Sequence, residues 1–159
     1  MKDSPVTTTS YNEEADVDKI LSEGGVHARI YLEVQATDTD AAKIAMENTV
    51  SNRLLQYENI TVLKVSMYDI LKEENAEYFS GVSEVEFVAD DFRWMINAVL
   101  KYGPAAVEII EPPEVKLPSD MMHSIVADIA DFSHLYSQQI IKLLKDPERK
   151  ALYEKMLGN

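Results

Sequence analysis

Cysteine is absent from this chain of 159 residues. Its absence excludes disulfide scaffolds, thiolate zinc sites, iron–sulfur clusters and cysteine nucleophiles. No apolar run approaches the roughly 20 residues that a membrane helix requires. Residues 1–10 also lack the basic and apolar segments of a secretory signal. We therefore expect a soluble, cytoplasmic protein that contacts no membrane.

Basic residues are scarce. There are 15 of them against 28 acidic residues, which gives a formal net charge of −13 at pH 7. A field of that sign repels nucleic-acid phosphates, and the four arginines are scattered along the chain rather than clustered: Arg29, Arg53, Arg93 and Arg149. The composition disfavours nucleic-acid binding by this chain alone. The simplest explanation of the excess of acidic residues is that it keeps the protein soluble. The functional alternative is that the protein docks on a basic partner.

Motifs for nucleophilic catalysis and for phosphate binding are missing as well. The chain has no Gly-x-Ser-x-Gly elbow and only three histidines. Gly24-Gly25 follows a predicted helix rather than a strand, so this pair marks a helix end and not a phosphate-binding loop. These absences argue against an enzyme, and nothing in the sequence indicates a cofactor.

One weak metal constellation is present on a predicted helix, where Asp128, Asp131 and His134 recur at three-residue steps. Because a helix turns once in 3.6 residues, such steps drift around its surface and the side chains do not converge on one ion. The spacing also differs from the His-Glu-x-x-His zinc motif. We predict a solvated helix face with no metal bound.

Hydrophobic residues make up 46% of the chain, which is enough to fill the core of one domain. The clearest element is a strand over residues 26–34, in which apolar residues from Val26 to Val34 alternate with polar or aromatic ones. Apolar periods and cap residues predict the remaining elements. These are strands at about 60–70, 82–89 and 106–111, and helices at about 13–23, 39–57, 92–102, 119–145 and 147–158.

The order of the central elements, strand-helix-strand-strand-helix-strand, predicts an α+β fold of the ferredoxin-like βαββαβ type. This is a two-layer sandwich in which two helices cover one face of a four-stranded antiparallel sheet. We expect a flexible N-terminus over residues 1–12, the α+β domain over 13–117 and a helical extension over 118–159. The long helix of about 26 residues would reach about 39 Å. That length exceeds a strand, so the helix packs on its own sheet or projects toward a partner chain.

The open face of the sheet is the predicted binding or interface surface, because the pleat sends alternate side chains of each strand to it. It mixes aromatic residues with charges of both signs. The candidates are His27, Arg29, Tyr31, Lys64, Tyr68, Glu84, Glu86 and Glu108. The alternative interpretation is an ordinary solvated sheet surface. Glutamates on the third strand, where an RNA-recognition sheet needs basic and aromatic residues, argue against RNA stacking.

The segment from Glu84 to Val115 contains a strand, an aspartate at a helix start, Trp94, a Leu-x-x-Gly helix stop at Gly103, a Val-Glu-Ile strand and the exit Glu111-Pro112-Pro113-Glu114-Val115. In these features it resembles the C-terminal extension domain of WYL-type bacterial transcription regulators. The resemblance implies a regulatory, oligomerising βαββαβ module and carries over no catalytic residue. This chain has no helix-turn-helix and no WYL domain, so the basic ligand-binding residues of that domain are missing.

These observations predict a non-enzymatic binding or regulatory module that forms a homodimer and can take a small-molecule ligand. The contact would come from the long helix with the terminal helix, or from Arg29, Tyr31, Lys64 and Tyr68 on the sheet face. One alternative is a small enzyme or anion-binding protein, in which Arg29 and Lys64 hold the anion and His27 acts as acid or base. The other is an acidic protein that docks on a basic partner.

Overall fold

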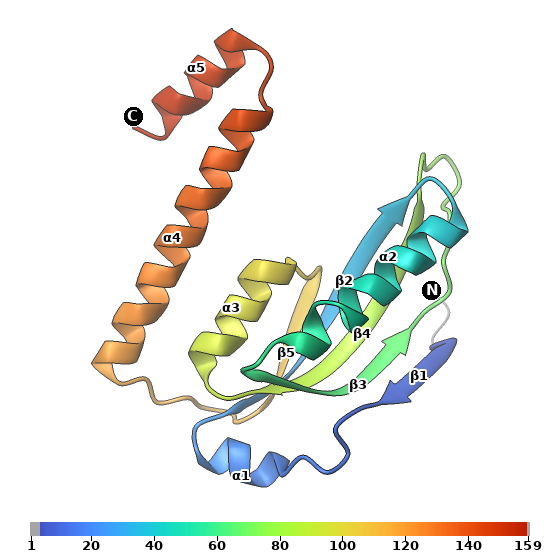
Figure 1. The fold of residues 1–159 in the computed structure, drawn as a ribbon, viewed down its shortest axis with the longest axis vertical. Coiled ribbons are helices and arrows are strands. Elements are labelled where there is room, and N and C mark those ends of the chain that lie inside the picture. Colours follow the sequence, from blue (N-terminus) through green and yellow to red (C-terminus); the bar gives the residue numbers. More distant parts are fainter. Residues whose placement is uncertain (1–3, 159) are drawn as a thin grey trace. The chain divides into compact units, whose positions relative to one another are not determined.

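The structure, a computed structural model, describes residues 4–158, and the chain divides between Lys116 and Leu117 into two compact units. The first unit is an α+β fold built on a five-stranded antiparallel sheet (Figure 1). Its elements are β1 (Thr7–Ser10), α1 (Val17–Ser22), β2 (Val26–Ala36), α2 (Thr39–Ser51), the 3₁₀ turn η1 (Leu54–Gln56), β3 (Ile60–Met67), β4 (Phe79–Ala89), α3 (Phe92–Tyr102) and β5 (Ala106–Glu111).

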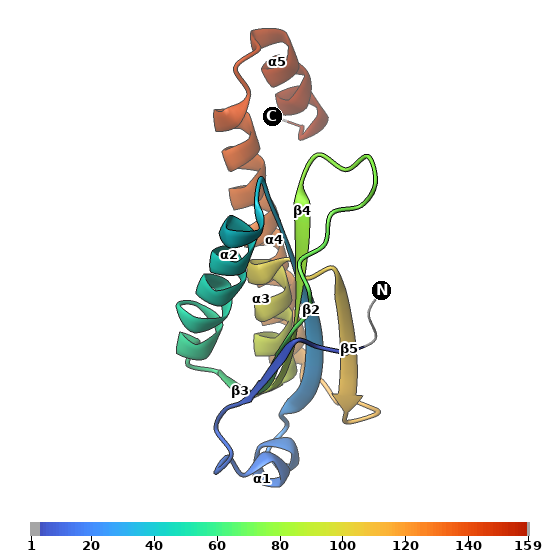
Figure 2. The ribbon, with the colours of Figure 1, turned by 90° about the vertical axis from the view of Figure 1, so that its right-hand side faces the viewer.

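The strand order across the sheet is β1-β3-β4-β2-β5, and every pair of neighbours is antiparallel. The central pair, β2 with β4, runs over eleven residues from Val26 opposite Ala89 to Ala36 opposite Phe79. Helices α2 and α3 lie on the same face of this sheet (Figure 2). No helix in the described part of this unit lies on the opposite face of the sheet. This opposite face is the open face, and the predicted site residues lie on it.

The sheet has five strands rather than the four predicted. The additional strand, β1, lies inside the segment predicted to be flexible and pairs with β3, with Thr7 opposite Met67. The hydroxyls of Thr8 and Ser66 add a hydrogen bond of 3.2 Å between the two strands. All four residues of β1 are polar, so apolar and polar residues do not alternate along it. Only its backbone hydrogen bonds to β3 define it as a strand, which is why the sequence pattern did not predict it.

The first helix begins later than predicted, after Asp16 instead of Asn12. Asp16 accepts a hydrogen bond from the Lys19 amide at 3.0 Å and caps the helix. Asn12 instead takes a left-handed conformation with a φ of 48°, which asparagine tolerates. Its side-chain amide donates to the Val62 carbonyl at 2.8 Å, so Asn12 holds the incoming chain against β3.

Several other boundaries shift. The helix predicted over residues 39–57 ends at Ser51 and is followed by the separate turn η1, and the strand predicted over 60–70 ends at Met67. The strand predicted from Val82 begins at Phe79, because it pairs with β2 along its whole length. The predictions for 92–102 and 106–111 are confirmed.

Local capping explains why helix α3 matches its prediction. Asp91 accepts a hydrogen bond from the Trp94 amide at 2.9 Å at the start of the helix. Gly103 ends it in a left-handed conformation with a φ of 54°, which favours glycine, and donates to the Val99 carbonyl at 2.9 Å. Both signals are readable in the sequence because they depend only on neighbouring residues.

The core of this unit lies between the sheet and helices α2 and α3. Phe87 on β4 is its largest fully buried side chain, and Ile30 on β2 and Val50 on α2 are also fully buried. Alternation then sends the side chains between these positions, such as Arg29 and Glu86, to the open face. Burial of one face therefore determines which residues form the candidate site.

The second unit consists of α4 (Ser119–Leu143) and α5 (Pro147–Met156), which folds back beside the end of α4 (Figure 1). Asp146 caps α5 by accepting hydrogen bonds from the amides of Glu148 (2.9 Å) and Arg149 (3.2 Å), and Pro147 takes the first helical position. The two helices end earlier than the predicted 145 and 158. Among the described residues, no helix is both long and apolar enough to cross a membrane.

Candidate functional site

Arg29 lies on the open face, on strand β2, which has a neighbouring strand on each side. The register places Glu86 of β4 opposite Arg29 on one side and Glu108 of β5 opposite it on the other. Glu84 is two residues before Glu86 and therefore points to the same face. Three carboxylates from two strands thus surround one guanidinium. We call these four residues the Arg29 cluster.

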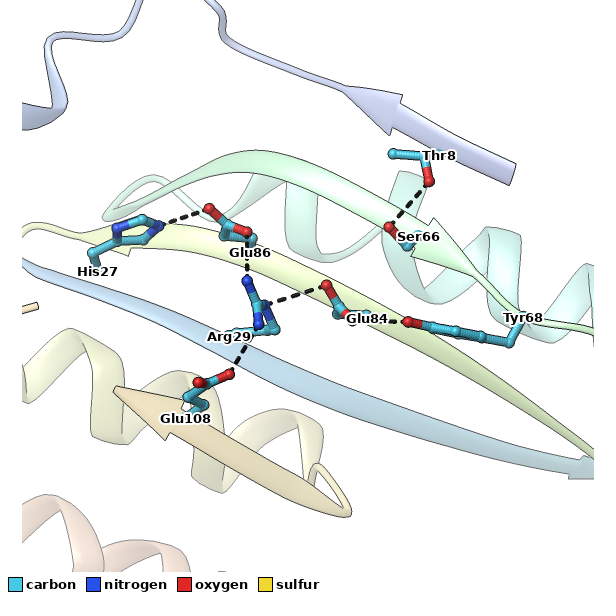
Figure 3. Close-up of polar contacts among 8 residues, drawn as sticks. All are labelled: Thr8, His27, Arg29, Ser66, Tyr68, Glu84, Glu86 and Glu108. Atoms are coloured by element: carbon cyan, nitrogen blue, oxygen red, sulfur yellow. Dashed lines mark hydrogen bonds and ion pairs between the residues drawn. The ribbon is translucent and has the colours of Figure 1, made fainter. Parts of the chain in front are cut away.

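Each edge of the guanidinium meets a different carboxylate (Figure 3). Nη1 lies 3.0 Å from Oε2 of Glu108, Nη2 lies 3.1 Å from Oε2 of Glu86, and Nε lies 3.2 Å from Oε1 of Glu84. The first two contacts are hydrogen bonds, whereas the Nε contact is at ion-pair distance without hydrogen-bond alignment. The planar fork of arginine suits such divergent contacts in a way that a lysine ammonium does not.

Two further predicted residues extend the cluster at its ends. His27 Nε2 lies 3.0 Å from Oε1 of Glu86, and the Tyr68 hydroxyl donates to Oε2 of Glu84 at 2.9 Å (Figure 3). The side chains are only partly accessible, with 15% of His27, 13% of Glu84 and 27% of Arg29 exposed. Solvent therefore screens these contacts less than it screens surface ion pairs.

The contacts shift the pKa values of three groups. The hydrogen bond with Glu86 raises the pKa of Arg29 further above its ordinary value. Burial opposes ionisation of Glu86, but hydrogen bonds from Arg29 and His27 outweigh it and lower the pKa of that carboxyl. The hydrogen bond to Glu84, together with burial, raises the pKa of Tyr68. All three shifts favour the protonation states that hold the cluster together near neutral pH.

The open face has an excess of carboxylates. Three glutamates surround one arginine, so the cluster carries net negative charge. Lys64 on β3 lies opposite Glu86 in the register but makes no ion pair with a described residue. The arginine proposed to hold an anion is therefore already neutralised by its own sheet. Sequence reasoning selected these residues, but it did not anticipate that they bind one another.

Two other candidate sites, a hollow in the first unit and the predicted metal ligands on α4, have weaker structural support. A hollow of about 270 Å³ is lined by residues that include Glu33, Glu73 and Tyr78, and its volume is below the roughly 300–1,000 Å³ of typical ligand pockets. Among residues 4–158, no group of three or more histidines and carboxylates is arranged to hold a metal ion. Asp128, Asp131 and His134 thus do not converge, and the His134 ring instead hydrogen-bonds Gln138 at 2.8 Å.

The sequence over residues 27–158 matches the MJ0538 family, so the match covers most of the chain. The chain belongs to the MJ0538 family. A relative of this MJ0538-family chain is an uncharacterised protein of Methanocaldococcus jannaschii, 32% identical over 95 residues. Those residues make up 60% of this chain and 35% of the relative, so the chain spans about a third of the relative's length. No solved structure matches the chain.

This MJ0538-family protein carries a second surface of interest on helix α4. Seven large apolar side chains there are exposed, by fractions between 38% for Phe132 and 78% for Leu143. We call them the α4 stripe: Met122, Val126, Ile129, Phe132, Leu135, Tyr136 and Leu143. The rings of Phe132 and Tyr136 stack with centroids 6.0 Å apart. The sequence pattern predicted this helix, but only the structure shows that these side chains are uncovered.

Acid is expected to weaken the sheet of this MJ0538-family protein through Glu86. A folded-state pKa below the ordinary 4.5 means that ionised Glu86 stabilises the fold above about pH 4.5. That contribution is lost as the pH falls through the lowered pKa. We expect Glu86→Gln to flatten the decline in melting temperature between about pH 5 and pH 3. Glu47→Gln, at an exposed site on α2, is the matched control. An unchanged decline in the Glu86→Gln variant would contradict the assignment.

Proposed function

We propose that this protein is a non-enzymatic binding module that self-associates as a dimer through the α4 stripe. The exposure of seven large apolar side chains on one 25-residue helix carries the proposal. A side chain of this size has on the order of 200 Å² of surface, so the exposed fractions correspond to roughly 700–800 Å² per copy. A typical monomer exposes apolar patches of only about 300–600 Å². A standard interface buries about 800 Å² per partner.

The fold proposed for the first unit is ferredoxin-like. The order β2-α2-β3-β4-α3-β5 and the sheet order β3-β4-β2-β5, with both helices on one face, support it. Strand β1 would then be an addition at the β3 edge. The resemblance of residues 84–115 to an oligomerising extension domain of WYL-type regulators also supports a regulatory module of this kind.

Self-association is expected to depend on the α4 stripe. The wild-type protein, with a chain mass of 18.0 kDa, should be a dimer at tens of micromolar. The double variant Ile129→Asp with Phe132→Asp should be monomeric, because charges in an apolar interface are costly to desolvate. Native mass spectrometry and light scattering after size exclusion measure both states.

The matched control is Ile44→Asp, which changes an exposed isoleucine on helix α2 (57% exposed) and should leave the dimer intact. Circular dichroism of each variant checks that the helices persist. A wild-type protein that remains monomeric at tens of micromolar would contradict the proposed self-association.

A second candidate function is the docking of a basic partner on the open sheet face. The carboxylate excess of the Arg29 cluster favours it over the anion-binding alternative, because Arg29 already contacts three glutamates. The charge of the chain is also unevenly distributed, with 22 acidic against 10 basic residues up to Lys116. A hetero-complex in the native mass spectrum of protein isolated from its host would support this candidate.

A further inference from the structure

We infer that two copies pair through α4 in antiparallel orientation, with Phe132 of each copy packed against Tyr136 of the other. This inference rests on the proposed self-association and specifies the partner, the direction and the register. Three features of the helix carry it. They are the spacing of its apolar residues, the polarity of its charges and the positions of two charged residues beside the stripe.

The apolar spacing is that of a two-helix seam. Met122, Ile129, Tyr136 and Leu143 recur at intervals of seven residues, and all four are exposed. Phe132 follows Ile129 by three residues and supplies the second seam position of its heptad. Such a repeat returns the same side chains to one stripe of the helix, although Ile125 within that stripe is buried. A second helix can therefore pack on the stripe from Ile129 to Leu143. The surface therefore suits another long helix better than a flat or globular partner.

The charges of the second unit are polarised along the chain. Asp120, Asp128 and Asp131 lie in the first half of α4, whereas Lys142 lies in its last turn and Lys145 follows its end. Parallel pairing of two copies would align like charges with one another, and antiparallel pairing aligns opposite charges. The helix dipoles favour the same choice, because the positive start of one helix then lies beside the negative end of the other. Helix α4 is thus complementary to its own reversed copy.

The register follows from placing the aromatic pair at the centre. When Phe132 of one copy faces Tyr136 of the other, the twofold axis lies near residues 134–135. Asp128 of each copy then lies level with Lys142 of the other. Asp128 directly precedes the seam residue Ile129, and Lys142 directly precedes the seam residue Leu143. Residues at such flanking positions form the interhelical ion pairs of coiled coils. One register therefore satisfies the apolar seam and the charges together.

Cysteine cross-linking tests this geometry sharply, because the chain has no cysteine of its own. Leu135 precedes a seam position, is 60% exposed and lies on the proposed axis, so it meets Leu135 of the other copy. Met122 of the two copies would be about 24 helical residues apart, or roughly 36 Å at 1.5 Å per residue. A disulfide needs Cα atoms within about 7 Å. In parallel pairing, by contrast, Met122 meets Met122.

The experiment compares the single variants Leu135→Cys and Met122→Cys in the full chain under mild oxidation, on non-reducing gels. We expect Leu135→Cys to form covalent dimer in most of the sample and Met122→Cys to form no more than the control. The control is Leu71→Cys, an exposed leucine (49%) in the first unit. Light scattering of each reduced variant verifies that it is still dimeric.

The other outcomes overturn the inference. Cross-linking of Met122→Cys, whether alone or together with that of Leu135→Cys, means parallel pairing in register, because each residue then lies level with its counterpart in the other copy. Dimers that cross-link at neither position refute the α4 register while leaving self-association intact. A monomeric wild type refutes the proposed function itself, so the two failures are distinguishable.

Discussion

Replacement of Arg29 by methionine is expected to lower the free energy of unfolding of the sheet unit by about 2–3 kcal/mol at pH 7. Methionine retains much of the apolar stem of arginine but removes the guanidinium that contacts Glu84, Glu86 and Glu108. Three partly buried carboxylates would then repel one another across the sheet. Removing one partner from a fully buried pair costs about 3–5 kcal/mol, and the partial exposure of this cluster lowers the estimate.

The pH dependence of the Arg29→Met variant separates this explanation from lost packing. Without the guanidinium, Glu86 loses the hydrogen bond from Arg29 that lowers its pKa, whereas burial still raises that pKa. The deficit is then smallest below about pH 4.5, where carboxyls are protonated, and grows as the pH rises. Urea unfolding at pH 4.5 and pH 7 measures it. Arg53→Met, at an exposed arginine, is the control, and an equal deficit at both pH values would refute the electrostatic cause.

Replacement of Phe87 by alanine is expected to cost about 3–5 kcal/mol of the unfolding free energy. Phe87 is fully buried on the central strand β4 and is the largest such side chain, so truncation leaves a cavity where strands and helices meet. Tight packing prevents the surroundings from collapsing fully into that space. The effect should be independent of pH, unlike that of Arg29→Met.

Trp94 provides the measurement for Phe87→Ala, because it is the single tryptophan and belongs to the sheet unit. Its ring meets Tyr57 edge-on with centroids 6.3 Å apart, so unfolding of this unit should change its fluorescence. Tyr78→Ala, at an aromatic residue that is 43% exposed, is the control and should cost less than about 1 kcal/mol. A loss at Phe87 no larger than at Tyr78 would mean that Phe87 does not lie in a tightly packed core.

The open sheet face and the α4 stripe differ in whether their side chains have partners within the chain. On the open sheet face, Arg29, Glu86 and Tyr68 have found partners within the chain, so their contacts stabilise the sheet before any ligand arrives. On helix α4 the seven apolar side chains of the α4 stripe remain exposed to solvent. Exposed apolar area favours association, whereas satisfied ion pairs do not. This difference is why we assign self-association to α4 rather than to the sheet.

Local signals in the sequence predicted much of the secondary structure. Asp91 and Gly103 define helix α3 because capping depends on residues a few positions apart. The two-residue period of β2 correctly separated Arg29 from Ile30 by face, since the pleat alternates side chains whatever the partner strand is. Strand β1 escaped prediction because four polar residues have no period, and only pairing with β3 makes them a strand.

The sequence by itself therefore determined most of the elements and the faces of the strands, because both follow from spacing along the chain. Only the tertiary structure decided the strand order, the five-stranded sheet and the contacts of Arg29 with three glutamates. Glu86 and Glu108 are 57 and 79 residues from Arg29 in sequence. Residues so distant meet only through register, which is set by the packing of the whole sheet and not by any local pattern.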